Sequence, residues 1–493
     1  MKIRILTLAS LAALLAVASL AHAQTAPAPK PTPAAATQPW KQISIPPLHE
    51  FKPAQPKRIQ LTNGMLIFLQ EDHELPFING QILIRGGSRQ EPAGKIGLVR
   101  LYGEAWRTSG TKTHSGDQLD DILEAKAAHL ESSGGTDSTS LSWNSLKQDF
   151  DSVFADAVDL LLHPEFKPDK LQLGKRQIET GISRRNDDAA GIASREANKL
   201  IYGADSPYAR QAEFATVEAV TLDDLKKWHD STVVPNNIII GISGDFDPAV
   251  MEAKLRAAFE SLPKGTTIQP DKLSFPGPKP GVYFVEKSDV DQSNIYIVGL
   301  GTVRNNPDYY ALSVMDEIFS GGFSSRVVQK VRTKLGLAYS VGGGLGTAYD
   351  HPGRFSVVAG TKSASTVAAT QAMMDEIKRL KTDPPTPTEL RKAKDDELNS
   401  FIFNYDSPSK VMGEQISLAF YGYPADFLEK YRAGIEKVTA EDVSRVANKY
   451  IDPSKLAILV VGNESEMGTP LSKLGAVTNI DITIPMPEKP AGK

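Results

Sequence analysis

The chain contains short apolar runs, bounded by turn residues, of the kind that forms β-strands. Residues 58–61 and 65–69 flank an Asn-Gly dipeptide, which favours a tight hairpin turn, and residues 81–85 form a third run. The same pattern starts again at residues 282–285, beyond the middle of the chain. It therefore predicts two sets of strands, each opening one half of the chain.

Longer stretches between these runs carry apolar residues at helical spacing. Leu119, Ile122, Leu123 and Leu130 predict one amphipathic helix, and residues 367–380 predict another. Because hairpin-like strands and long helices occur in both halves, we expect an α+β fold.

The two halves also share a register, which indicates an internal duplication. Residues 217–224 align without a gap onto residues 435–442, an offset of 218 residues. Thr221 and Thr439 each stand where a helix N-cap is expected, with an acidic residue in the first turn. A proline, an apolar strand and a glycine then follow at the same offset in both halves, so we predict two homologous domains.

The first residues have the pattern of a secretory signal peptide. Lys2 and Arg4 precede an apolar run over residues 5–20, and an Ala-His-Ala cleavage site ends at Ala23. The run is shorter than the roughly 20 residues that a membrane span needs. We expect cleavage after Ala23 and an exported, periplasmic mature chain without a membrane span.

Proline-rich stretches complete the division of the chain. The first is rich in Pro and Ala and is typical of an extended arm, and the second separates two portions of similar size. We therefore expect a signal peptide (1–23), an arm (24–56), an N-terminal domain (57–264), a linker (265–281), a C-terminal domain (282–475) and a tail (476–493).

Composition excludes several classes of partner and site. The net charge of -4 and the pI of about 6.1 give no general attraction for nucleic acid or anionic lipid. The absence of cysteine excludes disulfides, thiolate catalysis and cysteine-ligated zinc. His22 leaves with the signal peptide and His49 lies in the arm. The remaining histidines lack the spacing of a metal motif, so we expect surface or packing roles for His73, His114, His129, His163, His229 and His351.

The strongest chemical signal lies in the second half. Residues 320–326 read Ser-Gly-Gly-Phe-Ser-Ser-Arg, and residues 331–340 read Val-Arg-Thr-Lys-Leu-Gly-Leu-Ala-Tyr-Ser. Arg332 and Tyr339 are hydrogen-bond donors that can stabilise the negative charge developing on a peptide carbonyl under attack. The structural alternative is that Arg332 caps a helix end while Tyr339 is a half-buried strand residue.

This motif resembles the C-terminal-domain signature of the pitrilysin/insulinase family of zinc metallopeptidases, in which an Arg and a Tyr seven residues apart face the scissile bond. The strand-turn opening, the capped helices and the duplication resemble that family from about residue 57 to 465. The resemblance implies a fold similar to mitochondrial processing peptidase, with two homologous domains, each a mostly antiparallel sheet packed with long helices.

The first half departs from the family at its zinc motif. Active relatives carry H-x-x-E-H after a Gly-Leu pair, and a third ligand, Glu, farther along the chain. Here Arg100 and Glu104 occupy the histidine positions, Gly103 the general-base position, and Gly181 stands near the third-ligand position. Because a cation repels Zn²⁺ and glycine cannot activate water, we expect this chain to bind no cofactor.

Some members of the family are heterodimers in which a metal-free subunit contributes the Arg/Tyr pair. The resemblance therefore implies a subunit inactive alone, whose Arg332 and Tyr339 act on an unfolded peptide for a homologous partner carrying zinc in H-x-x-E-H. Gly342, Gly343 and Gly344 either let substrate approach or relieve crowding at a strand end. The alternative is an inactive homologue that binds peptides or serves in assembly. A serine hydrolase is disfavoured because no Gly-x-Ser-x-Gly elbow is present.

Overall fold

The computed structural model describes residues 53–269 and 271–486, all of which belong to one compact unit. The expected signal peptide, its cleavage site after Ala23 and most of the arm lie outside the described residues. Within the described ranges, no helix combines the length and apolar character needed to cross a membrane.

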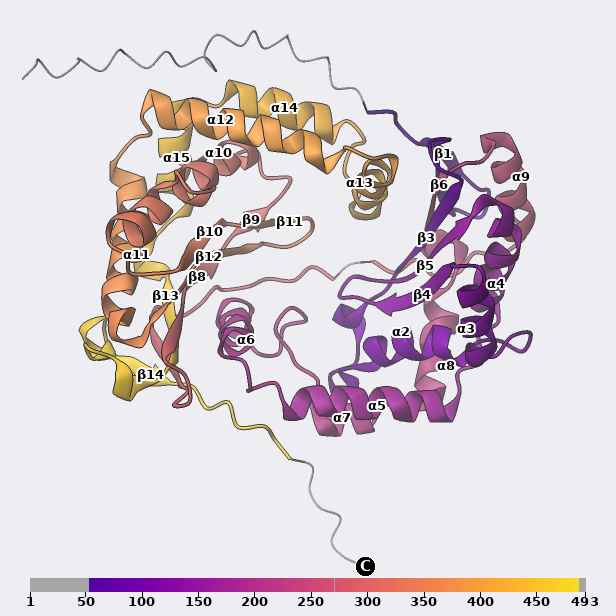
Figure 1. The fold of residues 1–493 in the computed structure, drawn as a ribbon, viewed down its shortest axis with the longest axis horizontal. Helices are drawn as coiled ribbons and strands as arrows, with labels where there is room; N and C mark the ends of the chain where they lie inside the picture. Colours follow the sequence, from indigo (N-terminus) through magenta and orange to yellow (C-terminus); the bar gives the residue numbers. More distant parts are fainter. Residues whose placement is uncertain (1–52, 270, 487–493) are drawn as a thin grey trace, which may run out of the picture. The chain divides into compact units, whose positions relative to one another are not determined.

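The first half contains a six-stranded sheet with helices packed against it (Figure 1). Its order is β1-β2-β6-β3-β5-β4, and neighbours are antiparallel except for the parallel pair β2 and β6. The predicted hairpin joins β1 to β2, with Gly64 in the turn at a φ of 95°. The strands are Lys57–Gln60 (β1), Leu66–Glu71 (β2), Phe77–Arg85 (β3), His129–Gly134 (β4), Ser138–Leu146 (β5) and Ile238–Gly244 (β6).

Helix α2 lies at the centre of the first core. It packs against β4, α5 and α8, and its Trp106 and Tyr102 are among the largest fully buried side chains. The indole of Trp106 donates to the carbonyl of Leu160 at 2.7 Å, which joins α2 to α4. The helices of this half span Leu98–Ser109 (α2), Gly116–Ala125 (α3), Phe150–Leu162 (α4), Pro168–Ser183 (α5), Ala189–Tyr202 (α6), Phe214–Glu218 (α7), Leu222–Thr232 (α8) and Pro248–Phe259 (α9).

The second half repeats this topology, which confirms the predicted duplication. Five strands have the order β7-β13-β8-β12-β10, matching β2-β6-β3-β5-β4, and the parallel pair recurs between β7 and β13. The strands are Gly281–Glu286 (β7), Gln292–Leu300 (β8), Thr302–Val303 (β9), Ser340–Leu345 (β10), Thr347–Ala348 (β11), Arg354–Lys362 (β12), Ala457–Gly462 (β13) and Val477–Asn479 (β14). The α-helices are Tyr309–Ser320 (α10), Thr366–Thr382 (α11), Pro387–Phe401 (α12), Pro408–Tyr421 (α13), Phe427–Lys437 (α14) and Ala440–Tyr450 (α15).

The predicted helix caps are confirmed in both halves. The hydroxyl of Thr221 accepts from the amide of Asp224, and Thr439 accepts from Asp442 in the same way. The carboxylate of each aspartate in turn accepts a hydrogen bond from the backbone amide of its threonine, which completes a capping box. The same capping-box pattern therefore begins both α8 and α15.

One helix of each half packs on the sheet of the other half. Helix α6 packs on β8 and β13 through an apolar row that includes Ile192 and Ala197. Helix α13 packs on β2 and β6, where Met412 and Ile416 meet Phe68. Hydrophobic burial on both sheets thus connects the two homologous halves.

One expectation about element boundaries was wrong. Leu130 does not continue the helical stripe: α3 ends at Ala125, Ala127 takes a φ of 48°, and Leu130 is a fully buried residue of β4. The left-handed residue breaks the helical register that the spacing suggested. The expected tail, 476–493, contributes β14 to the second sheet, where it runs parallel to β7. The side chains of β14 are all exposed, so no apolar pattern marked it.

Candidate active-site residues

Arg332 lies in a rare type of helix. The segment Val328–Lys334 (η6) is a π-helix, which ends with the amide of Leu335 bonded to the carbonyl of Lys330 at 3.1 Å. π-Helical turns occur often at functional sites because their wider winding changes the direction of side chains. A connection of residues 335–339, which includes Tyr339, joins this helix to the start of strand β10 at Ser340.

The structure brings Arg332 and Tyr339 together at the surface. The guanidinium carbon of Arg332 lies 5.5 Å from the ring centre of Tyr339 and 4.8 Å from that of Phe323. Tyr339 is 86% exposed and Phe323 is 71% exposed. We refer to Phe323, Arg332 and Tyr339 as the Arg-aromatic cluster. Sequence analysis missed Phe323, which is the variable position of the Gly-Gly-x-Ser-Ser-Arg string.

The cluster leaves its polar groups accessible. Among the described residues, no carboxylate lies within ion-pair distance of the Arg332 guanidinium, and no side chain or backbone group bonds the Tyr339 hydroxyl. Tyr339 is therefore not the half-buried strand residue of the structural alternative. The contacts with the two rings orient the guanidinium while its N–H groups remain available as donors.

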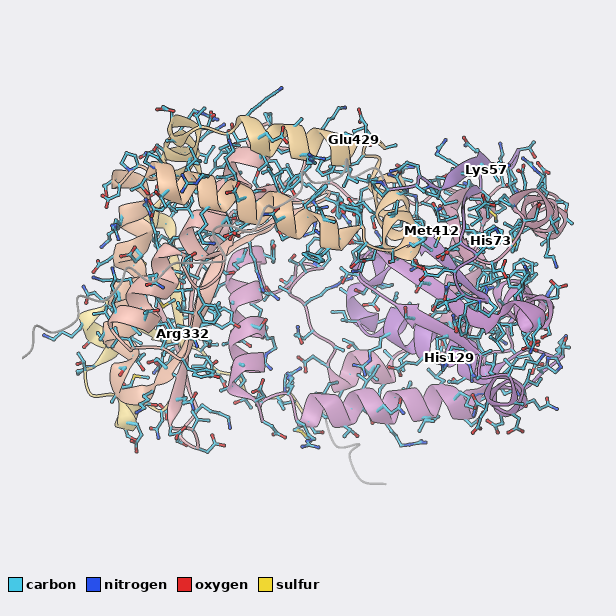
Figure 2. All side chains as sticks on the ribbon, turned by 45° about the horizontal axis from the view of Figure 1, so that its top comes forward. Lys57, His73, His129, Arg332, Met412 and Glu429 are labelled. Atoms are coloured by element: carbon cyan, nitrogen blue, oxygen red, sulfur yellow. The ribbon has the colours of Figure 1, made fainter. Side chains whose placement is uncertain are left out.

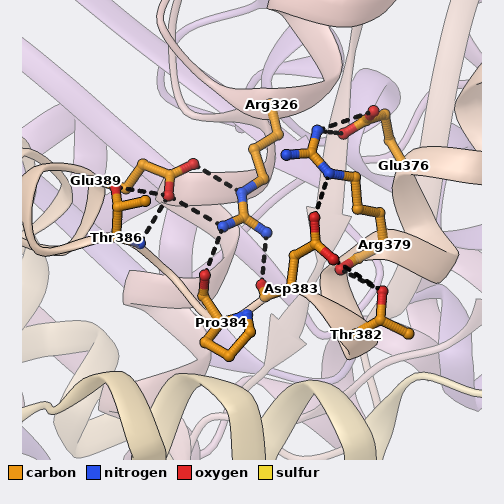
Figure 3. A network of polar contacts seen from close by, with 8 residues as sticks. All are labelled: Arg326, Glu376, Arg379, Thr382, Asp383, Pro384, Thr386 and Glu389. Atoms are coloured by element: carbon orange, nitrogen blue, oxygen red, sulfur yellow. Dashed lines mark hydrogen bonds and ion pairs between the residues drawn. The ribbon is translucent and has the colours of Figure 1, made fainter.

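Arg326 fixes the segment that precedes η6 (Figure 3). Its nearly buried guanidinium donates to both carboxylate oxygens of Glu389, at 2.8 and 3.0 Å, and to the carbonyls of Asp383 and Pro384 at 2.9 and 3.2 Å. The bond from Arg326 lowers the pKa of Glu389 to about 2, so the carboxylate stays charged at neutral pH. Arg326 is thus a structural residue that attaches the motif to the loop between α11 and α12.

The three glycines of β10 differ in their surroundings. Gly343 has a φ of 135°, and a Cβ there would lie 1.9 Å from the carbonyl oxygen of Ser356. A Cβ on Gly344 would lie 2.8 Å from the carboxyl of Asp316, whereas one on Gly342 would meet nothing within 4 Å. Close packing therefore explains Gly343 and Gly344, and Gly342 alone faces open space.

The positions of α2 that the resemblance assigns to the zinc motif contain an ion pair. The Nε of Arg100 donates to Glu104 at 2.9 Å, one helical turn away. Between them Gly103 packs against β4 so closely that a Cβ would lie 2.3 Å from the amide nitrogen of Gly134. A glutamate side chain has no room at this position. These residues do not fit a zinc ion, and no catalytic step can be derived through one here.

Gly174, rather than Gly181, is the residue of α5 that faces this position. A Cβ on Gly174 would lie 3.2 Å from a carboxylate oxygen of Glu104, whereas one on Gly181 would meet nothing within 4 Å. The structure does not bring Gly181 into contact with Glu104. Neither glycine offers a ligand atom.

The histidines of the described residues are dispersed. Four of them pair with single aspartates, and His229 accepts from the Tyr102 hydroxyl at 2.9 Å inside an aromatic cluster. Burial lowers the pKa of His229 to about 4, so its ring is neutral. No group of three His, Asp or Glu side chains suited to a metal occurs in the part of the chain that the structure describes.

Two known protein-family models match this chain. The family described as "Insulinase (Peptidase family M16)" matches residues 66–198, and "Peptidase M16 inactive domain" matches residues 219–396. This chain belongs to peptidase family M16. The model described as inactive matches residues 219–396, whereas Arg100, Gly103 and Glu104 lie inside the match to the insulinase model at residues 66–198.

Individual M16 relatives are distant but span most of the chain. "Non-peptidase homolog YmxG" of Helicobacter pylori is 22% identical over 404 residues, covering 81% of this chain and 92% of that protein. An "Uncharacterized zinc protease" of Rickettsia bellii is 22% identical over 415 residues, covering 82% of this chain and 97% of that protein. A solved peptidase M16 inactive domain from Pseudomonas fluorescens matches with a TM-score of 0.77 at 24% identity, covering 85% of this chain and 100% of that chain. The two-domain M16 fold is therefore shared.

Proposed function

We propose that this chain is the metal-free subunit of an M16 peptidase that acts outside the cytoplasm. Its Arg332 and Tyr339 donate hydrogen bonds to the scissile carbonyl of an unfolded peptide, while a homologous partner with an intact H-x-x-E-H motif supplies the zinc. The observation that supports this role is the Arg-aromatic cluster, in which an accessible guanidinium lies beside an accessible phenol.

The chemistry requires donors at the place where negative charge develops. A guanidinium N–H and a phenol O–H both donate, and neither needs a metal to do so. Loss of one such donor typically costs about 2.7–4 kcal/mol of transition-state stabilisation, or about 100- to 1,000-fold in rate. The flanking strand β10 would supply the wall along which the peptide lies, with Gly342 as its open position.

The test is coexpression of this chain with a zinc-bearing M16 homologue from the same host, followed by an assay of unfolded-peptide cleavage. Tyr339→Phe and Arg332→Ala are each expected to lower kcat by about 100- to 1,000-fold, as loss of one donor does. Tyr339 is exposed and Arg332 is half-buried, and neither side chain belongs to the core, so assembly, measured by size-exclusion chromatography, should not change.

A matched control is Arg391→Ala, which removes an exposed arginine from α12. It should leave both cleavage and assembly unchanged. If the Arg332 and Tyr339 variants behave like this control, the assigned role is wrong, and the chain is then a peptide-binding or assembly protein with a vestigial pair.

A further inference from the structure

A cavity of about 480 Å³ in the second half has a strongly aromatic wall. It lies among residues of α10, α12, α13 and α14, and none of the Arg-aromatic cluster lines it. Phe401 stacks on Tyr431 with ring centres 5.1 Å apart, and Tyr309 lies 5.8 Å from the same ring. The aromatic lining residues are Tyr309, Tyr349, Phe401, Tyr405, Phe427 and Tyr431.

Two carboxylates open into this cavity. Glu397 accepts a hydrogen bond from the Tyr431 hydroxyl at 2.5 Å. Glu414 has no hydrogen-bond or ion-pair partner within the described ranges; the charge of Arg304 acts on it electrostatically. Burial raises the pKa of both carboxyl groups, which means that their negative charges lack full compensation in the structure.

Neither of the two cations that line the cavity forms an ion pair with Glu397 or Glu414 among the described residues, and the Nε of Arg304 is buried without a hydrogen-bond partner. Arg304 donates to the Tyr349 hydroxyl at 2.5 Å, and its guanidinium lies 4.1 Å from the centre of that ring. Lys410 pairs with Asp406 at 2.8 Å and donates to the carbonyl of Phe403 at the same distance. Glu414 therefore forms no ion pair with either of these two cations.

We propose that this cavity binds an organic cation that a peptide presents as a lysine or arginine side chain or as its N-terminal ammonium. Glu397 and Glu414 hold the charge, and the rings contribute cation–π attraction and pack against the apolar stem. The inference rests on the proposed function for one point, the peptide nature of the ligand. It adds a preference for basic peptides at a site separate from Arg332 and Tyr339.

The test uses the purified chain alone and measures peptide binding by fluorescence anisotropy. The first probe is an N-acetylated peptide with one arginine, and the second has citrulline in its place, which removes the charge while keeping the shape. A third peptide has a free N-terminus and no basic side chain. Binding of the first or the third, at least tenfold tighter than that of the citrulline peptide, supports the proposal and identifies which group the pocket takes.

Glu414→Gln and Glu397→Gln should each weaken binding of the cationic probe by about tenfold, as the loss of a charge-assisted hydrogen bond does. The control is Glu429→Gln, an exposed carboxylate on α14, the helix that also carries Phe427 and Tyr431 (Figure 2). The proposal is overturned if neither the arginine peptide nor the free-N-terminus peptide binds the wild-type chain more tightly than the citrulline peptide, or if the control variant weakens binding equally. Neither result depends on cleavage, so failure here is distinct from failure of the Arg332 and Tyr339 assay.

Discussion

Arg100 and Glu104 form an ion pair at 2.9 Å across one turn of α2, at the two positions that the sequence resemblance assigns to the zinc-binding histidines of active M16 relatives. The pair satisfies one carboxylate oxygen of Glu104, while the other, Oε2, is buried without a hydrogen-bond partner among the described residues. Exposed pairs of this kind contribute little stability, typically below about 1 kcal/mol. The obstacle to a restored metal site is instead the lack of space for a side chain at Gly103, which lies between them in the sequence.

Restoring the zinc motif should fail on steric grounds. The variant Arg100→His, Gly103→Glu, Glu104→His needs a Cβ 2.3 Å from the Gly134 nitrogen, so we expect it to be destabilised by several kcal/mol, as overpacked sites are. The double variant that keeps Gly103 should fold normally. Metal analysis and chemical denaturation measure both effects; stoichiometric zinc in a triple variant of unchanged stability would contradict the prediction.

The glycines of β10 should separate structural from functional roles. Gly343→Ala places a Cβ 1.9 Å from a backbone oxygen at a φ of 135°, so it should destabilise the chain strongly. Gly342→Ala meets no neighbouring atom and should change the free energy of unfolding by less than about 1 kcal/mol. Denaturant unfolding compares the two. Should Gly342→Ala also lower cleavage in the coexpressed complex, the open position of β10 contacts substrate.

The contact of α13 with the first sheet depends on Gly241. A Cβ there would lie 2.4 Å from Cδ1 of Ile416 and 3.0 Å from the sulfur of Met412, the α13 residue labelled in Figure 2. We expect Gly241→Val to cost about 1–3 kcal/mol by overpacking. Gly413→Ala on α13 meets no atom within 4 Å and should be neutral or slightly stabilising, since alanine favours helix. Equal unfolding free energies for the two variants would show that α13 does not pack as described.

His229 should make stability depend on pH between about 6.5 and 4. Burial depresses its folded-state pKa to about 4 from an ordinary value of 6.5, so the stability it contributes is present above pH 6.5 and is lost as pH falls toward 4. The full loss is on the order of 3 kcal/mol. His229→Gln should remove this part of the pH dependence, measured by denaturation at several pH values. His129→Gln, an exposed histidine on β4, should retain the wild-type dependence (Figure 2).

Local patterns predicted much of the fold. The Asn-Gly hairpin and the Thr221 and Thr439 caps were read correctly because each depends on neighbouring residues in the chain. Leu130 was misassigned because helical spacing alone does not show that the residue at Ala127 adopts a left-handed conformation. The strand β14 was missed because exposed side chains give no periodic signal.

The sequence by itself determined that the chain is duplicated and that it contains no H-x-x-E-H motif, since residue identity and fixed spacing suffice for both. Only the tertiary structure decided that Phe323 lies under Arg332, that Gly174 faces Glu104, and that residues as distant as Arg304 and Tyr431 line one cavity. The physical reason is that caps and turns form within a few residues, whereas stacking, steric exclusion and cavities depend on long-range packing.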